Sequence, residues 1–188
     1  MGHVLLDFAN VSEQKQLAGW HTVDMGPYAT TFLAAGCSDG RVRLMDVRTG
    51  ATAVPPLEHH TDAVSRMCFC AVGNFDYLIT ASMDGSVLLW NTSFLAAAGR
   101  SATTNANGTG GFGTGMRRRP MKKFGPLDHA ISSVAALEMF GSLRVIAGCH
   151  DSVAWMWSLD TAKIVANETW SVPFRDIHCT LDQARCGE

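Results

Sequence analysis

The sequence predicts an all-β protein built from a repeated unit, and three similar segments carry this prediction. They read Asp39–Asp46 (DGRVRLMD), Asp84–Asn91 (DGSVLLWN) and Asp151–Ser158 (DSVAWMWS), and each follows a stretch of small residues. The first two segments begin 45 residues apart, and the second and third begin 67 apart. A period of about 40–45 residues is typical of the four-stranded antiparallel blades of a β-propeller. The longer second interval indicates an insertion of 22 residues between two blades.

The first unit begins with two short runs that alternate apolar and polar or small residues. We expect strands at Trp20–Met25 and Thr30–Ala35, separated by a turn at Gly26–Pro27. The repeated segment at Asp39–Asp46 follows as a further strand. This unit matches the other two least well.

The middle unit shows the repeat most clearly. A polar turn over Leu57–Val64 leads into a strand at Ser65–Cys70, in which Met67 and Phe69 point to one face. Two further strands are expected at Tyr77–Ser82 and Ser86–Trp90, with a tight hairpin turn between them.

The third unit repeats the pattern after the insertion. Its four expected strands are Ile131–Ala136, Leu143–Ala147, Val153–Trp157 and Lys163–Ala166. Meandering strands at regular spacing, with turn residues between them, favour an all-β fold over alternating strands and helices.

Together these units predict the organisation of the chain. The expected parts are a partial flanking strand (1–18), a degenerate blade (19–58), a second blade (59–95), a flexible insertion rich in Gly, Ala, Ser, Thr and Asn with a basic end (96–126), a third blade (127–168), and the start of a further blade or a tail (169–188). Propeller rings have four or more blades. We therefore expect an incomplete ring, either part of a larger propeller or a chain that completes its ring with a partner. Closure of a four-bladed ring by the two termini is the alternative.

The segments around the repeat resemble the blades of WD-repeat β-propeller proteins. In that family a Gly-His pair opens each repeat and a Trp-Asp pair closes it; here the middle unit has His59-His60 and Trp90-Asn91. The resemblance implies a buried, hydrogen-bonded tetrad in each blade. In the middle unit its members are His60, Ser82, Asp84 and Trp90.

The other two units keep this pattern only in part. The third unit retains His129, Asp151 and Trp157, with Cys149 at the serine position. The first retains only Asp39, because Cys37 and Met45 replace the serine and the tryptophan. A buried aspartate needs hydrogen-bond donors and a buried tryptophan needs an acceptor, so we interpret the tetrad as structural and not catalytic.

Composition narrows the classes of function. Among the 188 residues, 15 Lys and Arg stand against 17 Asp and Glu, giving a net charge of −2. This balance favours neither nucleic acid nor a membrane surface as a partner. No apolar run of about 18 residues is present, so membrane insertion is not expected. The sequence begins without the features of a secretory signal, and we expect a cytoplasmic or nuclear protein.

The six cysteines are expected to be small buried residues and not disulfides or metal ligands. Cys37 and Cys149 occupy the same position of the repeat, and Cys68 and Cys70 have no second pair at zinc-site spacing. The chain also lacks a phosphate-binding loop with Lys-Ser/Thr and a Gly-x-Ser-x-Gly nucleophile motif. We expect no catalytic residues, no cofactor and no enzyme activity.

Two features are candidates for partner binding. Met45-Asp46-Val47-Arg48 resembles the Trp-Asp-x-Arg box by which some WD-repeat proteins dock to the adaptor of cullin ubiquitin ligases, with Asp46 and Arg48 matching. The alternative is a surface ion pair that contributes little. The second feature is the basic end of the insertion. Its cations are Arg117, Arg118, Arg119, Lys122 and Lys123.

Three interpretations of function follow. The first is a non-catalytic scaffold for protein–protein interaction within a multi-subunit assembly. The second is a substrate receptor of a cullin-type ubiquitin ligase, through Asp46 and Arg48. The third is a nuclear RNA-associated propeller that uses the basic run, which would also serve as an import signal or as a contact for an acidic partner. Few aromatic residues interleave with these cations, so a solvated linker is the simpler interpretation and nucleic acid is not favoured.

Overall fold

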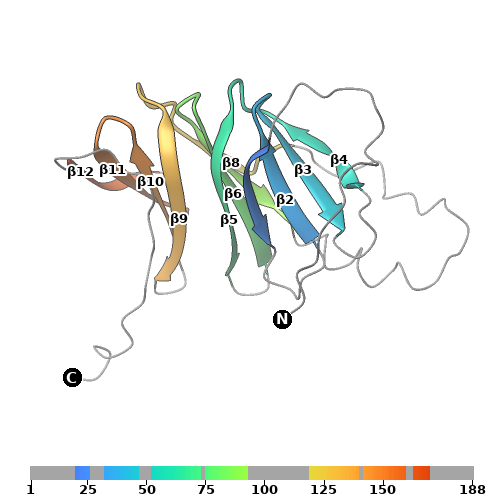
Figure 1. Cartoon of the computed structure of the whole chain (residues 1–188). Helices are drawn as coiled ribbons and strands as arrows, with labels where there is room; N and C mark the ends of the chain where they lie inside the picture. Colours follow the sequence, from blue (N-terminus) through green and yellow to red (C-terminus); the bar gives the residue numbers. More distant parts are fainter. Residues whose placement is uncertain are drawn as a thin grey trace, which may run out of the picture.

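The computed structural model describes residues 20–25, 32–46, 52–72, 75–92, 119–139, 142–159 and 163–169. These residues form twelve strands in three four-stranded antiparallel sheets, with no helix among them. The sheets follow one another in space in the order of the sequence (Figure 1). The prediction of an all-β fold with blades in an incomplete ring is confirmed for this part of the chain. None of the described segments is a helix long and apolar enough to cross a bilayer.

The first sheet has its strands in sequence order. They are β1 (Trp20–Met25), β2 (Phe32–Cys37), β3 (Arg41–Asp46) and β4 (Thr52–Glu58). The sequence did not indicate β4, since it contains Pro55 and Pro56, and its end was assigned to a polar turn. Proline lacks an amide donor, but it is tolerated in an outer strand and at a break in register, and β4 has both.

The middle sheet contains a correction to the sequence-based prediction. It consists of β5 (Val64–Val72), β6 (Phe75–Ser82), β7 (Val87–Asn91) and β8 (Lys122–Phe124). The short strand β8 lies in the segment that was predicted as a flexible insertion (96–126). Phe124 lies opposite Val87 and is buried, so its apolar ring anchors the end of the insertion to the sheet.

The third sheet has the same arrangement and uses no residue from outside its own unit. Its strands are β9 (Ile131–Met139), β10 (Ser142–Cys149), β11 (Val153–Ser158) and β12 (Ile164–Thr169). β9 packs beside β5 and β6 of the middle sheet.

The middle sheet is buried on both faces. Toward the first sheet, Leu78, Leu88 and Trp90 form a cluster with Val42 and Leu44. Toward the third sheet, the residues of β6 and β7 that alternate with these pack into a second cluster. That cluster includes Ile79, Val87, Leu89, Phe124, Ile131 and Trp157. Burial of both faces explains why β7 reads as an unbroken apolar run.

The turn that follows the second strand is the same in all three sheets. Residues Gly40, Gly85 and Ser152 have φ angles of 77°, 76° and 69°. Each donates its N–H over 3.2 Å to the carbonyl three residues earlier, at Cys37, Ser82 and Cys149 respectively. A turn of this kind followed by a left-handed residue is a common three-residue hairpin connection.

An aspartate completes each turn by accepting a hydrogen bond from the amide two residues later. The three pairs are Asp39 with Arg41 at 3.1 Å, Asp84 with Ser86 at 2.9 Å, and Asp151 with Val153 at 3.1 Å. This local bond explains why the aspartate recurs in every unit, including the two that lack other parts of the repeat.

Glycine in these turns also allows close approach to the next sheet. A Cβ atom at Gly40 would lie 2.6 Å from the carbonyl oxygen of His60, and one at Gly85 would overlap the carbonyl oxygen of Leu127. His60 and Leu127 belong to the segments that lead into the next sheet, so each of these turns docks against the start of the following blade.

Replacing Ser152 by glycine should stabilise the protein by about 1 kcal/mol, because Ser152 is the non-glycine residue with positive φ among the equivalent turns. Urea unfolding followed by tryptophan fluorescence measures the change. The matched variant Gly85→Ser should destabilise the protein by more than this, since it combines a left-handed φ with overlap against Leu127. Loss of stability in Ser152→Gly would contradict the strain argument.

Candidate functional site

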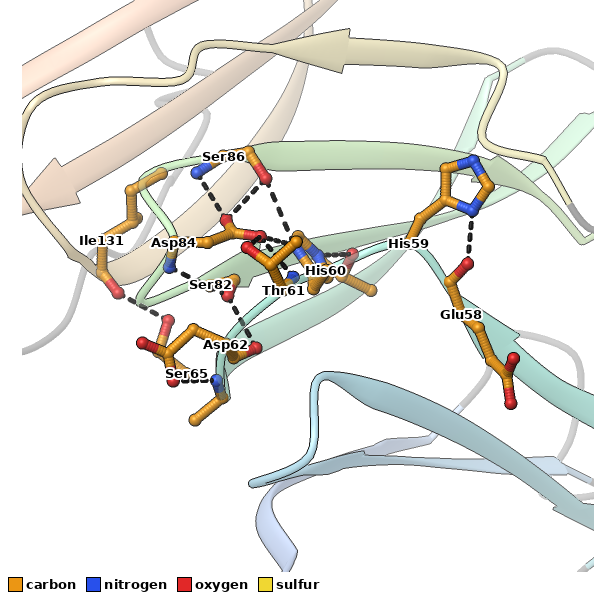
Figure 2. A network of polar contacts seen from close by, with 12 residues as sticks. Glu58, His59, His60, Thr61, Asp62, Ser65, Ser82, Asp84, Ser86 and Ile131 are labelled. Carbon is orange, nitrogen blue, oxygen red and sulfur yellow. Dashed lines mark hydrogen bonds and ion pairs between the residues drawn. The ribbon is translucent and has the colours of Figure 1, made fainter.

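The densest polar cluster in the described residues surrounds His60, which lies just before β5. Its side chain is fully buried. Its Nε2 atom is 2.8 Å from Thr80 Oγ1 and its Nδ1 atom is 3.2 Å from Asp84 Oδ2. The imidazole therefore connects the start of the blade to β6 and to the turn after it (Figure 2).

Trp90 in β7 joins the same cluster through Thr80. The indole Nε1–H donates to Thr80 Oγ1 over 3.0 Å. Because this hydroxyl already accepts from Trp90, it can donate its own hydrogen to His60 Nε2. In the tautomer that fits this arrangement, the ring N–H is on Nδ1 and faces the Asp84 carboxylate.

The sequence predicts Ser82 as the hydroxyl residue of the tetrad, but in the structure the hydroxyl that contacts both His60 and Trp90 is that of Thr80. Thr80 and Ser82 point to the same face of β6, so strand alternation does not distinguish them. The register between β6 and β7 distinguishes them, because Trp90 lies opposite Leu78. Thr80 is the diagonal neighbour of Trp90, whereas Ser82 lies one step farther along the same face.

Ser82 instead stabilises the turn. Its hydroxyl donates to the carbonyl oxygen of Asp62 over 3.0 Å and accepts from the backbone N–H of Asp84 over 3.1 Å. Ser82 thereby ties the segment that leads into β5 to the β6–β7 turn.

The Asp84 carboxylate is nearly buried and is satisfied by several donors. The backbone N–H groups of Thr61 and Ser86 each donate to it over 2.9 Å, and the Ser86 hydroxyl donates over 2.6 Å. Burial alone would raise the pKa of Asp84, but hydrogen bonds from His60, Ser86 and Thr61 outweigh it. The net result is a pKa well below the ordinary value for aspartate. Figure 2 shows the carboxylate between Ser86 and Thr61.

Ser86, His60 and Asp84 are residue types that also occur in catalytic triads, but their geometry does not suit that role. The Ser86 hydroxyl is buried and donates to Asp84 over 2.6 Å, while its distance to His60 Nδ1 is 3.2 Å. His60 Nε2, the other ring nitrogen, is occupied by Thr80. A nucleophile must be reachable by substrate and paired with a base. The cluster instead joins the segment before β5 to β6 and to the β6–β7 turn. The Asp-Gly-Ser sequence was the available signal for Ser86, which the sequence analysis did not select.

The third sheet holds its corresponding residues less tightly. His129 is 57% exposed at its side chain, and its Nε2 atom is 3.7 Å from Asp151 Oδ2. Ala147 occupies the position of Thr80, so this blade lacks the hydroxyl that would join histidine to tryptophan. Trp157 is instead held by aromatic contacts, with ring centroids 5.5 Å from Phe124 and 6.4 Å from Trp155.

The first sheet keeps the turn and little else of the pattern. Asp39 forms an ion pair with Arg41 at 3.6 Å, and Met45 and Cys37 are buried at the positions of Trp90 and Ser82. Asp46 ends β3 opposite Phe32 and is half-buried. Arg48 lies outside the described residues.

The five cations of the basic run differ in their surroundings, and the structure describes three of them. Arg117 and Arg118 lie outside the described residues, and Arg119 is exposed. Lys122 and Lys123 belong to β8, where the Lys122 ammonium donates to the carbonyl oxygen of Leu159 in the third blade. Part of the run therefore contributes to the packing of adjacent blades.

The four described cysteines are free thiols. Burial raises the pKa of Cys70 to about 12, with a smaller contribution from the charge of Asp76. Burial and the charge of Asp151 raise the pKa of Cys149 to about 12 in the same way. Burial also raises the pKa of Cys37. Thiols with such pKa values are weak nucleophiles at neutral pH. Cys179 and Cys186 lie outside the described residues, and within those residues no group of His, Cys, Asp and Glu could hold a metal ion.

Comparison with known proteins identifies the repeat. The family model for the WD domain, G-beta repeat, matches residues 52–91. Residues 52–91 are similar to a WD40 repeat. The matched segment begins at β4 of the first sheet and ends with β7 of the middle sheet, so the WD40 repeat spans two sheets.

The fold is also similar to that of a solved structure. The crystal structure of the computationally designed Ika8 protein has a TM-score of 0.60 to this chain at 13% sequence identity. The similarity covers 86% of this chain and 40% of the designed one, so the chain spans well under half of that protein. At this identity the likeness concerns the fold alone. A search of curated proteins gave no match.

Thr80→Val should destabilise the protein by about 3 kcal/mol, because it leaves both the Trp90 indole N–H and His60 Nε2 buried without a partner. Ser82→Ala should cost about 1 kcal/mol, since the groups it leaves without a partner are the carbonyl of exposed Asp62 and the N–H of partly exposed Asp84. Equilibrium unfolding in urea compares the two variants. Equal costs would contradict the assignment of Thr80 as the bridging residue.

Stability should depend on the charge of Asp84 at acidic pH. Because the folded-state pKa of Asp84 is depressed, its contribution is present above the unfolded-state pKa of about 3.9 and is lost as the pH falls through the folded-state value. Asp84→Asn should lower the free energy of unfolding by about 2 kcal/mol at pH 7. The variant should also show a shallower loss of stability between pH 5 and pH 2, measured by thermal unfolding across that range. Parallel pH profiles for the two proteins would contradict this role.

Proposed function

We propose that this WD40-repeat chain is a non-catalytic module for protein–protein interaction. The proposal rests on the burial and internal hydrogen bonding of the His60–Asp84–Ser86 cluster. In the described residues it is the group best equipped for catalysis, yet it is buried and its polar atoms are paired within the blade. A rigid scaffold with internally satisfied polar groups leaves its turns and edges for contact with partners.

The contact surface that we favour is the edge lined by the equivalent turns. We call it the turn edge and define it by the turns at 38–40, 83–85 and 150–152 together with the lead-in segments 59–62 and 127–129. The close approach of Gly40 to His60 and of Gly85 to Leu127 places these turns and segments side by side. Backbone contacts between neighbouring blades make this edge continuous.

The side chains along the turn edge indicate the chemistry of the partner. Its exposed carboxylates include Asp39, Asp62 and Asp128, and Glu58 lies beside Arg41 at the end of β4. Met83 adds an apolar side chain that is 38% exposed. A partner segment with lysine or arginine next to an apolar residue would complement this surface.

Charge reversal on the turn edge tests this proposal. Partners are first captured by proximity labelling, and their direct binding to the purified chain is then measured by calorimetry. Asp128→Lys should weaken binding at least tenfold and leave the melting temperature unchanged, since Asp128 is exposed. The matched control Asn167→Lys, on exposed β12 away from this edge, should bind like the wild type. Equal binding by both variants would exclude the turn edge as the contact surface.

A role as substrate receptor of a cullin-type ubiquitin ligase is the second candidate. It is supported by Asp46, which ends β3 immediately after buried Met45 and so matches the position of aspartate in the docking box. Co-purification of the ligase adaptor, lost in Arg48→Ala and kept in Arg119→Ala, would support it. The hydrogen bond from the Lys122 ammonium to Leu159 argues against the use of Lys122 in RNA binding. A cytoplasmic or nuclear location stays a prediction.

A further inference from the structure

Each of the three equivalent turns in the turn edge holds an aspartate, and these aspartates differ in how fully their charge is satisfied. Asp84 is the most enclosed, since its side chain is 9% exposed and accepts hydrogen bonds from Thr61 and Ser86. Asp39 is more exposed, but the guanidinium of Arg41 lies 3.6 Å from its carboxylate. Each of these two charges is therefore met by donors or by a cation of the chain itself.

Asp151 of the third sheet differs from both. Its Oδ1 atom accepts a hydrogen bond from the backbone N–H of Val153 over 3.1 Å. Among the described residues no donor lies within hydrogen-bond distance of its Oδ2 atom, since the Nε2 atom of His129 is 3.7 Å away. The Asp151 side chain is 24% exposed. One carboxylate oxygen of Asp151 is thus open to a donor from outside the chain.

The segment that leads into the third sheet lacks the imidazole that Asp84 receives from His60. The carbonyl oxygens of His60 and Leu127 lie nearest to the side-chain position of the glycine in the preceding turn, so Leu127 stands at the place of His60. His129, which the repeat pattern aligns with His60, lies two residues farther along the chain. Its imidazole comes only within 3.7 Å of Asp151 and remains 57% exposed.

The strand after the turn removes a second donor. Ser86, whose hydroxyl donates to Asp84 over 2.6 Å, is replaced by Val153 at the equivalent position. Valine has no side-chain hydrogen to donate, so only its backbone N–H is left for Asp151. The third unit therefore keeps the aspartate turn while leaving its carboxylate incompletely satisfied.

We propose that Asp151 anchors the partner of the turn edge by pairing with an arginine side chain, an inference that rests on the proposed function. A carboxylate partly withdrawn from water forms a stronger charge-assisted hydrogen bond than a fully exposed one. Arginine suits this position because its planar guanidinium can donate to the carboxylate and stack on the imidazole of His129. The apolar residue of the partner then lies toward Met83, since the turn that holds Met83 packs beside the segment that contains His129.

NMR titration of the 188-residue chain tests this assignment with a defined probe, the capped tetrapeptide Gly-Leu-Arg-Gly. The backbone amide signals of residues 127–129 and 150–152 should shift as the peptide is added. A second peptide, in which neutral citrulline replaces arginine, should cause no such shift because it cannot form an ion pair. Equal shifts with both peptides, or shifts centred on another part of the chain, would overturn the proposal.

Two matched variants test whether the charge of Asp151 is responsible for binding. Asp151→Asn removes the charge but keeps an oxygen that can accept from Val153, so the turn is retained. The affinity for the arginine peptide should fall about tenfold. Asp39→Asn makes the same change in the first sheet, where Arg41 already balances the charge, and should leave the affinity unchanged. Circular dichroism checks that both variants keep their β structure. Equal affinity of the wild type and Asp151→Asn would exclude this role of Asp151.

A partner captured by proximity labelling separates failure of this pairing from failure of the proposed function. Both Asp128→Lys and Asp151→Asn should weaken binding of that partner in calorimetry. If only Asp128→Lys weakens it, the turn edge remains the contact surface and the assignment of Asp151 is wrong. If neither variant weakens it, the turn edge and the pairing at Asp151 are both excluded.

Discussion

The charge of Asp84 organises the polar network of the middle blade. This carboxylate is nearly removed from water and is held by donors from two segments: His60 and Thr61 before β5, and the amide and hydroxyl of Ser86 just before β7. The charge is fully satisfied only when both segments are in place. Thr80 extends the same network through His60 to Trp90, whose ring packs into the cluster between the first and middle sheets. A polar contact thus fixes how two apolar surfaces meet.

The three sheets show that this network can be lost in steps while the fold is kept. The third sheet replaces the bridging hydroxyl with Ala147, and Trp157 is held by contacts with the rings of Phe124 and Trp155. The first sheet keeps the aspartate turn and replaces the tryptophan with buried Met45. What all three retain is the left-handed turn and the alternating apolar strands. Backbone geometry and burial are therefore sufficient for a blade, and the network makes the middle blade the best-defined one.

Sequence reasoning reached the fold because two signals are local: the repeated Asp-Gly turn and the alternation of apolar residues in the strands. It placed His60, Asp84 and Trp90 together through the resemblance of the repeat to WD-repeat blades. It named Ser82 as the hydroxyl residue of the tetrad and did not consider Thr80. Both side chains point to one face of β6, and only register decides which of them reaches Trp90. It missed β4 and β8, whose prolines and lysines resemble a loop until the neighbouring strand that pairs with them is known. The long distance between His129 and Asp151 could not be predicted from the sequence either, because it depends on how the surrounding residues pack.

The matched segment 52–91 is offset from the sheets by one strand, and this offset affects how such a chain can gain or lose blades. The repeat at 52–91 supplies the outer strand of one sheet and the three inner strands of the next. Excision of one repeat would remove β4 to β7 together and leave β3 facing β8, an outer strand of the same kind as the one lost. The first sheet would again have four strands, with β3 paired on both sides. Blades can thus be gained or lost by duplication or deletion of whole repeats without passing through a broken sheet.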